Sequence, residues 1–223
     1  MNADLLEIYE TLFDALGPQD WWPAETPFEV IVGAVLVQNT NWQNVRRAID
    51  ALREDDRLSP QRIAALDQEK LETLIRPAGY YRIKAKRLRA VVDWLLETCD
   101  GNLDELFKRP MRELRKQLLA VHGIGPETAD SILLYAGRLP TFVVDAYTVR
   151  IFHRHGWADA TDSDYHSLQA SIESTLPRVE QLFNEYHAMI VQIGKTYCKK
   201  HSPRCEDCPL RSKLPKGGPI EMG

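Results

Sequence analysis

The segment from Val121 to Arg150 reads VHGIGPETADSILLYAGRLPTFVVDAYTVR, and the rest of the chain is organised around it. A Gly-x-Gly turn at Gly123 and Gly125 joins two apolar runs. Pro126 follows at the expected first position of a helix, where the missing N–H of proline costs no hydrogen bond. The glycines carry no Cβ atoms, so backbone N–H groups can point outward and bind an anion such as a nucleic-acid phosphate. Asp145 then follows a second apolar run. An isolated Gly-x-Gly also fits an ordinary helix–helix turn, so the neighbouring motifs decide its meaning.

The composition is that of a globular protein. The chain has 223 residues, of which 44% are hydrophobic and 27% are charged, which suffices for one large or two small domains. Apolar residues recur at helical spacing and no segment alternates strongly enough for a sheet, so the fold is predicted to be all-α. No apolar run reaches the length of a membrane span, and the N-terminus resembles neither a secretory signal nor an Arg-rich transit peptide. We therefore expect a cytoplasmic, nucleoid-associated protein that does not contact membranes.

The formal net charge of −4 argues mildly against nucleic acid as a partner, but the charges are segregated along the chain. Two segments are rich in cations, and either could also be an ordinary solvated face. Their members are Arg82, Lys84, Lys86, Arg87 and Arg89 in the first, and Lys195, Lys199, Lys200, Arg204, Arg211, Lys213 and Lys216 in the second.

The order of an apolar run, Gly-x-Gly, Thr128-Ala129 and a later Val144-Asp145 resembles the helix-hairpin-helix DNA glycosylases of the endonuclease III superfamily. The resemblance implies an all-α fold of two helical domains with the active cleft between them. Residues 21–137 would form a six-helix domain that carries the hairpin. Residues 1–20 and 138–223 would form a discontinuous domain that ends in an iron–sulfur-like cysteine loop.

The same resemblance assigns roles to single residues. The hairpin residues would bind the DNA backbone, and Asp145 would stand beside the sugar whose base is removed. Gln38, in the polar run Gln-Asn-Thr-Asn-Trp, would enter the gap left by a flipped nucleotide, although a polar helix cap explains this run as well. Lys84, in a Gly…Lys-Ala segment, would open a helix near DNA. The expected DNA-binding residues are Gln38, Lys84, His122, Gly123, Gly125 and Thr128.

Members of the superfamily that cut the strand carry a lysine in the pattern Gly-x-Gly-x-Lys-Thr-Ala, and here the corresponding residue is Glu127. A carboxylate cannot form an imine with the sugar, so we expect an enzyme that removes the base with water and does not cut the strand by that route. Asp145 alone supports such chemistry, because an ionised carboxylate stabilises an oxocarbenium-like transition state and can orient water. Asp145 also fits a helix N-cap, and Glu127 fits a favourable first-turn acid whose catalytic role is doubtful.

Trp21, Trp22 and Trp42 are candidates to stack on a flipped base, and cation–π attraction would favour a positively charged alkylated purine. The Trp-Trp-Pro motif, the Gln-Asn-Thr-x-aromatic motif and the glutamate in the lysine position resemble the 3-methyladenine glycosylase branch of the superfamily. Each of the three tryptophans could instead fill the core.

Three cysteines read Cys198-x6-Cys205-x2-Cys208, a spacing similar to the [4Fe–4S] loop of endonuclease III relatives. The position of the fourth cysteine holds Leu214, which cannot bind iron. A cluster with another fourth ligand, a zinc ion on the three cysteines and His201, and a metal-free loop all remain open.

The function expected is a monofunctional base-excision-repair glycosylase that acts as a monomer on damaged, alkylated purines in double-stranded DNA. The alternatives are an endonuclease III-like glycosylase for oxidised or mismatched bases with AP-lyase activity, and a catalytically silent DNA-binding module. A pure binding module has no need of a carboxylate at Asp145, which favours the enzyme.

Overall fold

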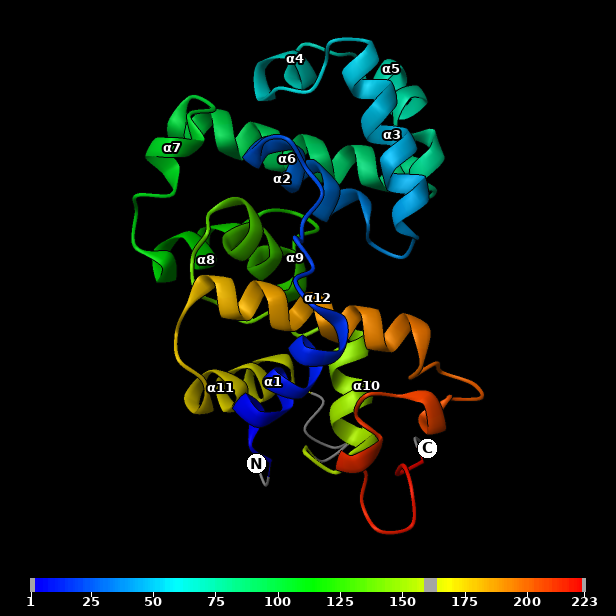
Figure 1. The fold of residues 1–223 in the computed structure, drawn as a ribbon. Coiled ribbons are helices and arrows are strands. Elements are labelled where there is room, and N and C mark those ends of the chain that lie inside the picture. The colour runs from blue at the N-terminus through cyan, green and yellow to red at the C-terminus, as the bar shows by residue number, and fades with distance from the viewer. Residues whose placement is uncertain (1–2, 159–163, 222–223) are drawn as a thin grey trace. The chain divides into compact units, whose positions relative to one another are not determined.

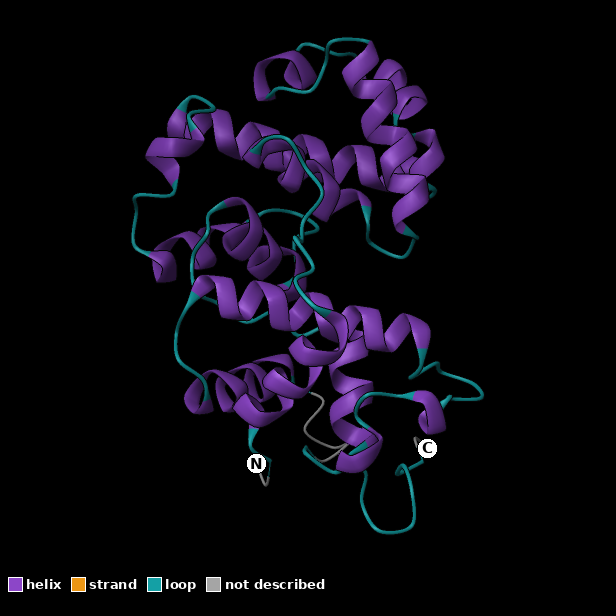
Figure 2. Cartoon of the chain, viewed as in Figure 1, coloured by secondary structure: helices purple, strands orange, loops and turns teal. Residues whose placement is uncertain are grey.

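The computed structural model describes residues 3–158 and 164–221, and within these ranges it consists of helices and loops with no β-strand (Figures 1 and 2). The predicted all-α class is confirmed. No helix in these ranges is long and apolar enough to cross a membrane. The α-helices are α1 (Leu5–Leu16), α2 (Pro27–Leu36), α3 (Trp42–Glu54), α4 (Pro60–Ala64), α5 (Gln68–Leu74), α6 (Tyr81–Cys99), α7 (Leu103–Leu106), α8 (Met111–Ala120), α9 (Pro126–Ser131), α10 (Ala146–Arg154), α11 (Tyr165–Thr175) and α12 (Glu180–Thr196). Short 3-10 turns are η1 (Arg76–Ala78), η3 (Cys205–Asp207) and η4 (Arg211–Lys213), and η2 (Ile132–Ala136) is a π-helical segment.

The chain divides into two compact units. The terminal unit comprises Met1–Trp21 and Pro140–Gly223, and the central unit comprises Trp22–Leu139. The domain boundaries expected from the resemblance stay a prediction, because a division by contacts does not test which segments fold independently.

Helix α2 is the core element of the central unit. Thr26 caps its N-terminus by accepting a hydrogen bond from the Glu29 N–H, and Pro27 occupies the first turn. All residues from Phe28 to Leu36 are buried, as an apolar helix without a polar face requires. Helices α3, α6 and η2 pack against it.

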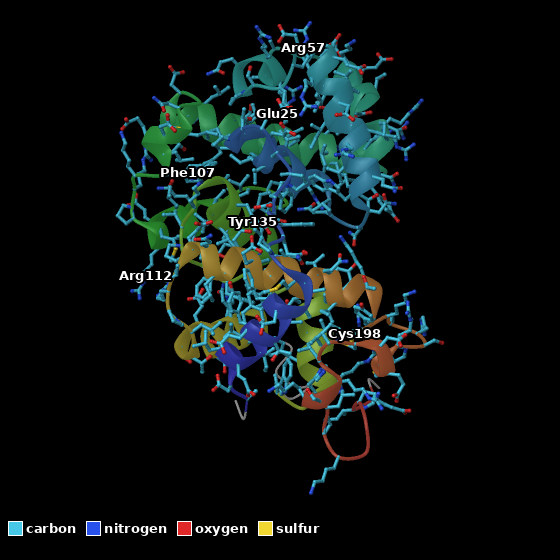
Figure 3. All side chains as sticks on the ribbon, in the orientation of Figure 1. Glu25, Arg57, Phe107, Arg112, Tyr135 and Cys198 are labelled. Atoms are coloured by element: carbon cyan, nitrogen blue, oxygen red, sulfur yellow. The ribbon has the colours of Figure 1, made fainter. Side chains whose placement is uncertain are left out.

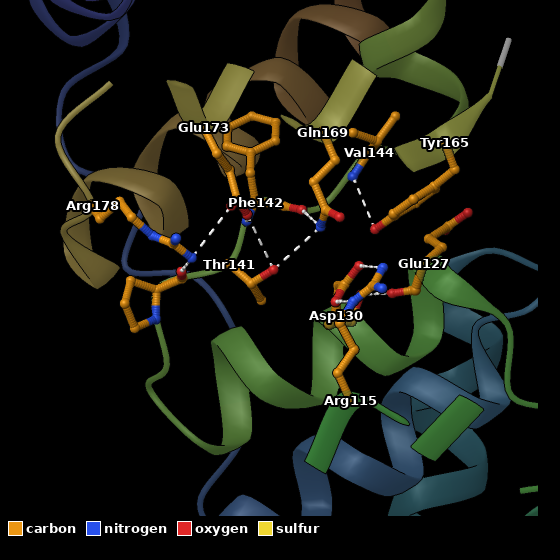
Figure 4. A network of polar contacts seen from close by, with 12 residues as sticks. Arg115, Glu127, Asp130, Thr141, Phe142, Val144, Tyr165, Gln169, Glu173 and Arg178 are labelled. Carbon is orange, nitrogen blue, oxygen red and sulfur yellow. Dashed lines mark hydrogen bonds and ion pairs between the residues drawn. The ribbon is translucent and has the colours of Figure 1, made fainter. Parts of the chain in front are cut away.

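The hairpin of the central unit consists of α8, the turn through Gly123 and Gly125, and α9. Gly123 has φ +82°, a left-handed conformation that favours glycine. The Arg115 guanidinium on α8 donates two hydrogen bonds to the Asp130 carboxylate on α9, at 2.7 and 2.8 Å (Figure 4). Asp130 is completely buried, so this bidentate ion pair holds the two helices together in the interior.

In the terminal unit, the extended residues Thr141 to Val144 lead into α10 and are held by side chains of α11. Glu173 accepts a hydrogen bond from the Phe142 N–H at 2.8 Å, and the Gln169 amide donates to the Phe142 carbonyl at 2.7 Å (Figure 4). These bonds satisfy backbone groups that would otherwise be buried without partners. The segment that leads to Asp145 at the N-terminus of α10 is therefore held by hydrogen bonds from α11.

Helices α10 and α12 approach closely at Gly194, and this contact yields a stability prediction. A Cβ atom on Gly194 would lie 2.2 Å from Cδ1 of Tyr147. Gly194→Ala is therefore expected to destabilise the protein by about 1–3 kcal/mol through overpacking, despite the better helical propensity of alanine. Urea unfolding measures the effect, and Gly125→Ala is the control because no atom lies within 4 Å of its Cβ position. Equal or greater stability of Gly194→Ala would show that the two helices do not pack as described.

Candidate active site and DNA-binding hairpin

Asp145 is the N-cap residue of α10, and its two carboxylate oxygens have different surroundings. Oδ1 accepts hydrogen bonds from the Thr148 N–H at 2.7 Å and from the Thr148 hydroxyl at 2.9 Å. Oδ2 lies 3.6 Å from Nε2 of His187 on α12. The side chain is 11% exposed. Asp145 is thus both a helix cap, as one sequence interpretation held, and a carboxylate whose second oxygen takes no part in the cap.

The Asp145 carboxyl stays ionised although it is largely buried. Burial acts to raise its pKa, but the contact with His187 and the hydrogen bonds from Thr148 outweigh burial and hold the pKa of Asp145 below its ordinary value. An ionised carboxylate with little solvent around it is the group that stabilises a nearby sugar cation most strongly.

The depressed pKa predicts how Asp145 titrates. An aspartate ordinarily titrates near pH 3.9, so Asp145 is expected to remain charged from about pH 5 upward. Its contribution to folding stability is present above the unfolded pKa and is lost as the pH falls through the lower, folded pKa. NMR of protein labelled with ¹³C at the aspartate carboxyl carbons, with Asp145→Asn to assign the signal, measures this titration. A midpoint above pH 4 would contradict the arrangement.

Two residues of α12 lie near Asp145 and were not predicted from the sequence as site residues, although Lys195 was counted in the second cation-rich segment. His187 is buried and contacts the carboxylate, and Lys195 lies two turns further along the same helix. Burial lowers the pKa of Lys195, although the charge of Asp145 opposes that shift. The Lys195 ammonium lies 5.4 Å from the centre of the Trp21 ring, which is within the range of a cation–π interaction. Trp21, a predicted base-pocket residue, thus contacts a protein cation in this structure.

In the central unit, Gln38 connects the end of α2 to the hairpin. Its amide Nε2 donates to the Gly123 carbonyl at 3.2 Å and to the Thr128 hydroxyl at 3.0 Å. The Arg87 guanidinium donates to Oε1 of the same amide. His122 and Gly125 are exposed, whereas Thr128 is buried. The structure therefore brings the predicted DNA-binding residue Gln38 into hydrogen-bond contact with two others, Gly123 of the turn and Thr128 of α9, and His122 and Gly125 belong to the same turn.

Lys84, which was predicted to bind DNA, is buried instead. It is 1% exposed, and its ammonium donates to the carbonyls of Leu36 at 2.9 Å and Ala78 at 2.7 Å. Burial, with a smaller contribution from the charge of Arg87, lowers the pKa of Lys84 to about 8. Lys84 thus binds the last carbonyls of α2 and η1 in the interior and does not present its charge at the surface, so it has no direct route to a phosphate.

The other cations of the segment from Arg82 to Arg89 do not form a single solvated face either. Arg89 donates to the carbonyls of Ala64 and Leu66, and Arg82 lies near Glu72. Lys86 is exposed.

Glu127, at the position of the lyase lysine, is an exposed residue in the first turn of α9, where a negative charge interacts favourably with the helix dipole.

Two of the predicted base-pocket tryptophans form one aromatic cluster in the central unit. The Trp22 ring lies edge-on to Trp42 at 5.1 Å and tilted against Tyr135 at 5.1 Å. Gly33 lies beneath them, since a Cβ there would come within 3.2 Å of Trp22 and 3.4 Å of Trp42. Tyr135, labelled in Figure 3, and Gly33 were not identified from the sequence, because only the folded chain brings η2 and α2 to the tryptophans.

The three cysteines Cys198, Cys205 and Cys208 line one small cavity of about 10 Å³ in the terminal unit. Arg150 and Arg154, one turn apart on α10, hold the start of this loop. Arg150 donates to the Cys198 carbonyl at 2.7 Å, and Arg154 donates to the Cys198 sulfur at 3.3 Å and to the Lys199 carbonyl at 2.7 Å. Burial raises the pKa values of the Cys205 and Cys208 thiols.

These residues do not fit a four-thiolate cluster. Leu214 lines the same cavity at the position expected for the fourth ligand, and the cavity has room for about one water molecule. His201, the histidine of the zinc alternative, is exposed and does not line the cavity. In the described ranges, no group of three or more His, Cys, Asp or Glu residues is arranged to hold a metal ion.

The fold and the site define an all-helical protein with a glycine hairpin in one unit and a buried, ionised aspartate at a helix N-terminus in the other. A family model described as "HhH-GPD superfamily base excision DNA repair protein" matches residues 32–188. The chain belongs to this superfamily.

Individual relatives agree with this membership. The "Putative DNA repair glycosylase MJ1434" of Methanocaldococcus jannaschii is 46% identical over 93% of this chain and 94% of its own length. Endonuclease III of Thermotoga maritima is 30% identical over 83% of this chain and 81% of its own length. The chain is accordingly a DNA N-glycosylase that binds DNA.

Solved structures show the same fold. The structure of H. pylori 3-methyladenine DNA glycosylase (MagIII) bound to 1,N6-ethenoadenine matches with a TM-score of 0.73 and 30% identity, and covers 86% of this chain and 98% of that chain. A non-covalent endonuclease III–DNA complex matches with a TM-score of 0.81 over 97% of both chains, at 23% identity. The expected resemblance to the endonuclease III superfamily is confirmed.

Proposed function

We propose that this DNA glycosylase removes alkylated purine bases from duplex DNA as a monomer, and that it hydrolyses the glycosidic bond without cutting the strand. The hairpin would hold the backbone, Gln38 would occupy the gap left by the flipped nucleotide, and Asp145 would face the sugar. The cytoplasmic, nucleoid-associated location of the protein stays a prediction.

The aromatic cluster on Gly33 is the observation that carries the choice of lesion. A flat, electron-poor purine can stack on tryptophan faces, and a positive charge on the base strengthens that interaction. An alkylated purine that is already cationic leaves readily, so one carboxylate suffices for its removal. The similarity to a 3-methyladenine glycosylase points in the same direction.

Glu127 supports the absence of strand cutting, because a carboxylate at the hairpin cannot form the imine that β-elimination needs. Asp145 would act by stabilising the sugar cation and by orienting the water that attacks it. His187 would hold the charged form of Asp145 by its contact with Oδ2.

The test is excision from duplexes that contain 3-methyladenine, thymine glycol, uracil or an adenine–8-oxoguanine pair. Release of 3-methyladenine is expected, with the strand intact until alkali is added and with no covalent complex trapped by borohydride. Release of thymine glycol together with a trapped complex would overturn the proposal in favour of a bifunctional enzyme. DNA binding without excision of any base would contradict the catalytic assignment.

The cysteine loop has its own test in the same preparation. Because Leu214 replaces the fourth ligand, we expect the freshly purified protein to lack a stoichiometric [4Fe–4S] cluster. Iron and zinc analysis together with the visible absorption spectrum measures this. Iron at the stoichiometry of a four-iron cluster, with visible absorption, would show that a non-cysteine ligand completes the site.

A further inference from the structure

Arg87, on α6, lies directly against the hairpin turn. A Cβ atom built on Gly123 would lie 2.3 Å from Cγ, 2.7 Å from Cδ and 2.8 Å from Nε of Arg87. The arginine side chain therefore crosses the bare α-carbon of Gly123, and glycine is required there both by its φ of +82° and by this contact. The guanidinium and the turn form one surface of the central unit.

The charge of Arg87 is not compensated by an acid in the described ranges. No carboxylate lies within 4.0 Å of its guanidinium, whereas Arg53 and Arg115 in the same unit are paired with Glu29 and Asp130. Its one hydrogen bond in these ranges goes to the neutral amide of Gln38. A partly buried guanidinium without a counter-ion is the group that a phosphate would compensate most directly, because its donors match phosphate oxygens.

The turn beside Arg87 supplies uncharged donors for the same anion. The N–H groups of Gly123 and Gly125 donate no hydrogen bond within the described ranges. The two backbone amides of the turn and the guanidinium that α6 places beside it combine directional donors with a full positive charge, which is the chemistry that recognises a phosphodiester.

Arg87 also fixes the orientation of Gln38. The amide nitrogen of Gln38 faces two acceptors, the Gly123 carbonyl and the Thr128 hydroxyl, and its oxygen faces the Arg87 guanidinium. Reversing the amide would place its oxygen against the Gly123 carbonyl and its NH₂ group against the guanidinium. The position of Gln38 therefore depends on Arg87.

We propose that Arg87 is the phosphate-binding cation of the hairpin and that the same guanidinium positions Gln38 for its task in the DNA. The inference rests on the DNA binding included in the proposed function, and it does not depend on which lesion is removed. It names a role for a residue outside the Gly-x-Gly motif.

The test measures the salt dependence of binding to an undamaged duplex. Loss of one phosphate contact is expected to reduce the slope of log K against log[salt] by about 0.9 in Arg87→Met and Arg87→Gln, while Arg87→Lys keeps most of the slope. Arg62→Met is the matched control, because Arg62 lies on α4, away from the hairpin. The neighbouring Gln61 donates to the carbonyl of Asp100, which places α4 at the C-terminal end of α6. That end is about 20 Å along the helix from Arg87, given its rise per residue, and the control slope should not change.

A second readout separates phosphate binding from support of Gln38. If Arg87 acted only by holding Gln38, Gln38→Ala would reproduce the effect of Arg87→Met on the slope. We expect instead that Gln38→Ala leaves the slope unchanged, and that both variants slow excision non-additively when combined. Full slope in a neutral Arg87 variant with wild-type thermal unfolding would overturn the proposal. Unfolding of both neutral variants, with Arg87→Lys folded, would also overturn it and assign Arg87 a structural role.

Discussion

Asp145→Asn is expected to slow base excision by at least about 10²–10³-fold while leaving DNA affinity nearly unchanged. The substitution removes the negative charge that would face the sugar cation. It keeps the shape of the side chain, and asparagine caps a helix N-terminus as well as aspartate does. The bonds from Thr148 to Oδ1 can therefore persist, and the fold should be preserved.

Single-turnover excision of 3-methyladenine and binding to the same duplex measure the two parts of this prediction. Asp164→Asn is the matched control, because Asp164 caps α11 in the same unit through the N–H groups of His166 and Ser167. That variant should keep full activity. Wild-type excision by Asp145→Asn would mean that the carboxylate is only a helix cap.

Arg115→Met is expected to destabilise the protein by about 3–5 kcal/mol, the largest stability effect predicted here. The substitution removes the two charge-assisted hydrogen bonds that the Asp130 carboxylate receives at 2.7 and 2.8 Å. Because Asp130 is 0% exposed, water cannot replace them without local opening of the hairpin. The same opening would separate α8 from α9, so DNA affinity should fall as well.

Urea unfolding at neutral pH measures this effect. Lys108→Met provides the control, because it removes an exposed pair with Glu105 in the same unit. Exposed pairs of this kind contribute at most about 1 kcal/mol. A cost for Arg115→Met no larger than that of the control would show that the Arg115–Asp130 pair does not hold the hairpin together.

The elements that could be predicted from the sequence are those whose cause is local. The turn follows from glycines at 123 and 125, which expose N–H groups, and Gly123 also permits the left-handed backbone found there. The buried α2 follows from an apolar run behind a Thr-Pro cap. The position of Asp145 between an apolar run and a helix predicted its cap, which the structure shows, whereas its catalytic role was predicted from the resemblance to the superfamily.

The features that could not be predicted depend on residues far apart in the chain. Lys84 was predicted to bind DNA because its Gly…Lys-Ala segment resembles the superfamily and its neighbours are basic, but tertiary packing directs its ammonium to the Leu36 and Ala78 carbonyls. Charge in a sequence does not reveal which side chains a helix turns inward. Likewise, His187 reaches Asp145 only because α10 and α12 pack together, a contact between residues remote in sequence.

The central claim is that the ionised Asp145 stabilises a sugar cation in DNA held by the hairpin. The most direct measurement is the affinity for a duplex with a protonated pyrrolidine nucleotide, a cationic mimic of that sugar, against one with a neutral tetrahydrofuran nucleotide. Asp145→Asn is predicted to weaken binding of the cationic duplex by about tenfold or more and to leave binding of the neutral duplex unchanged. Equal effects on the two duplexes, or no effect on either, would contradict the claim.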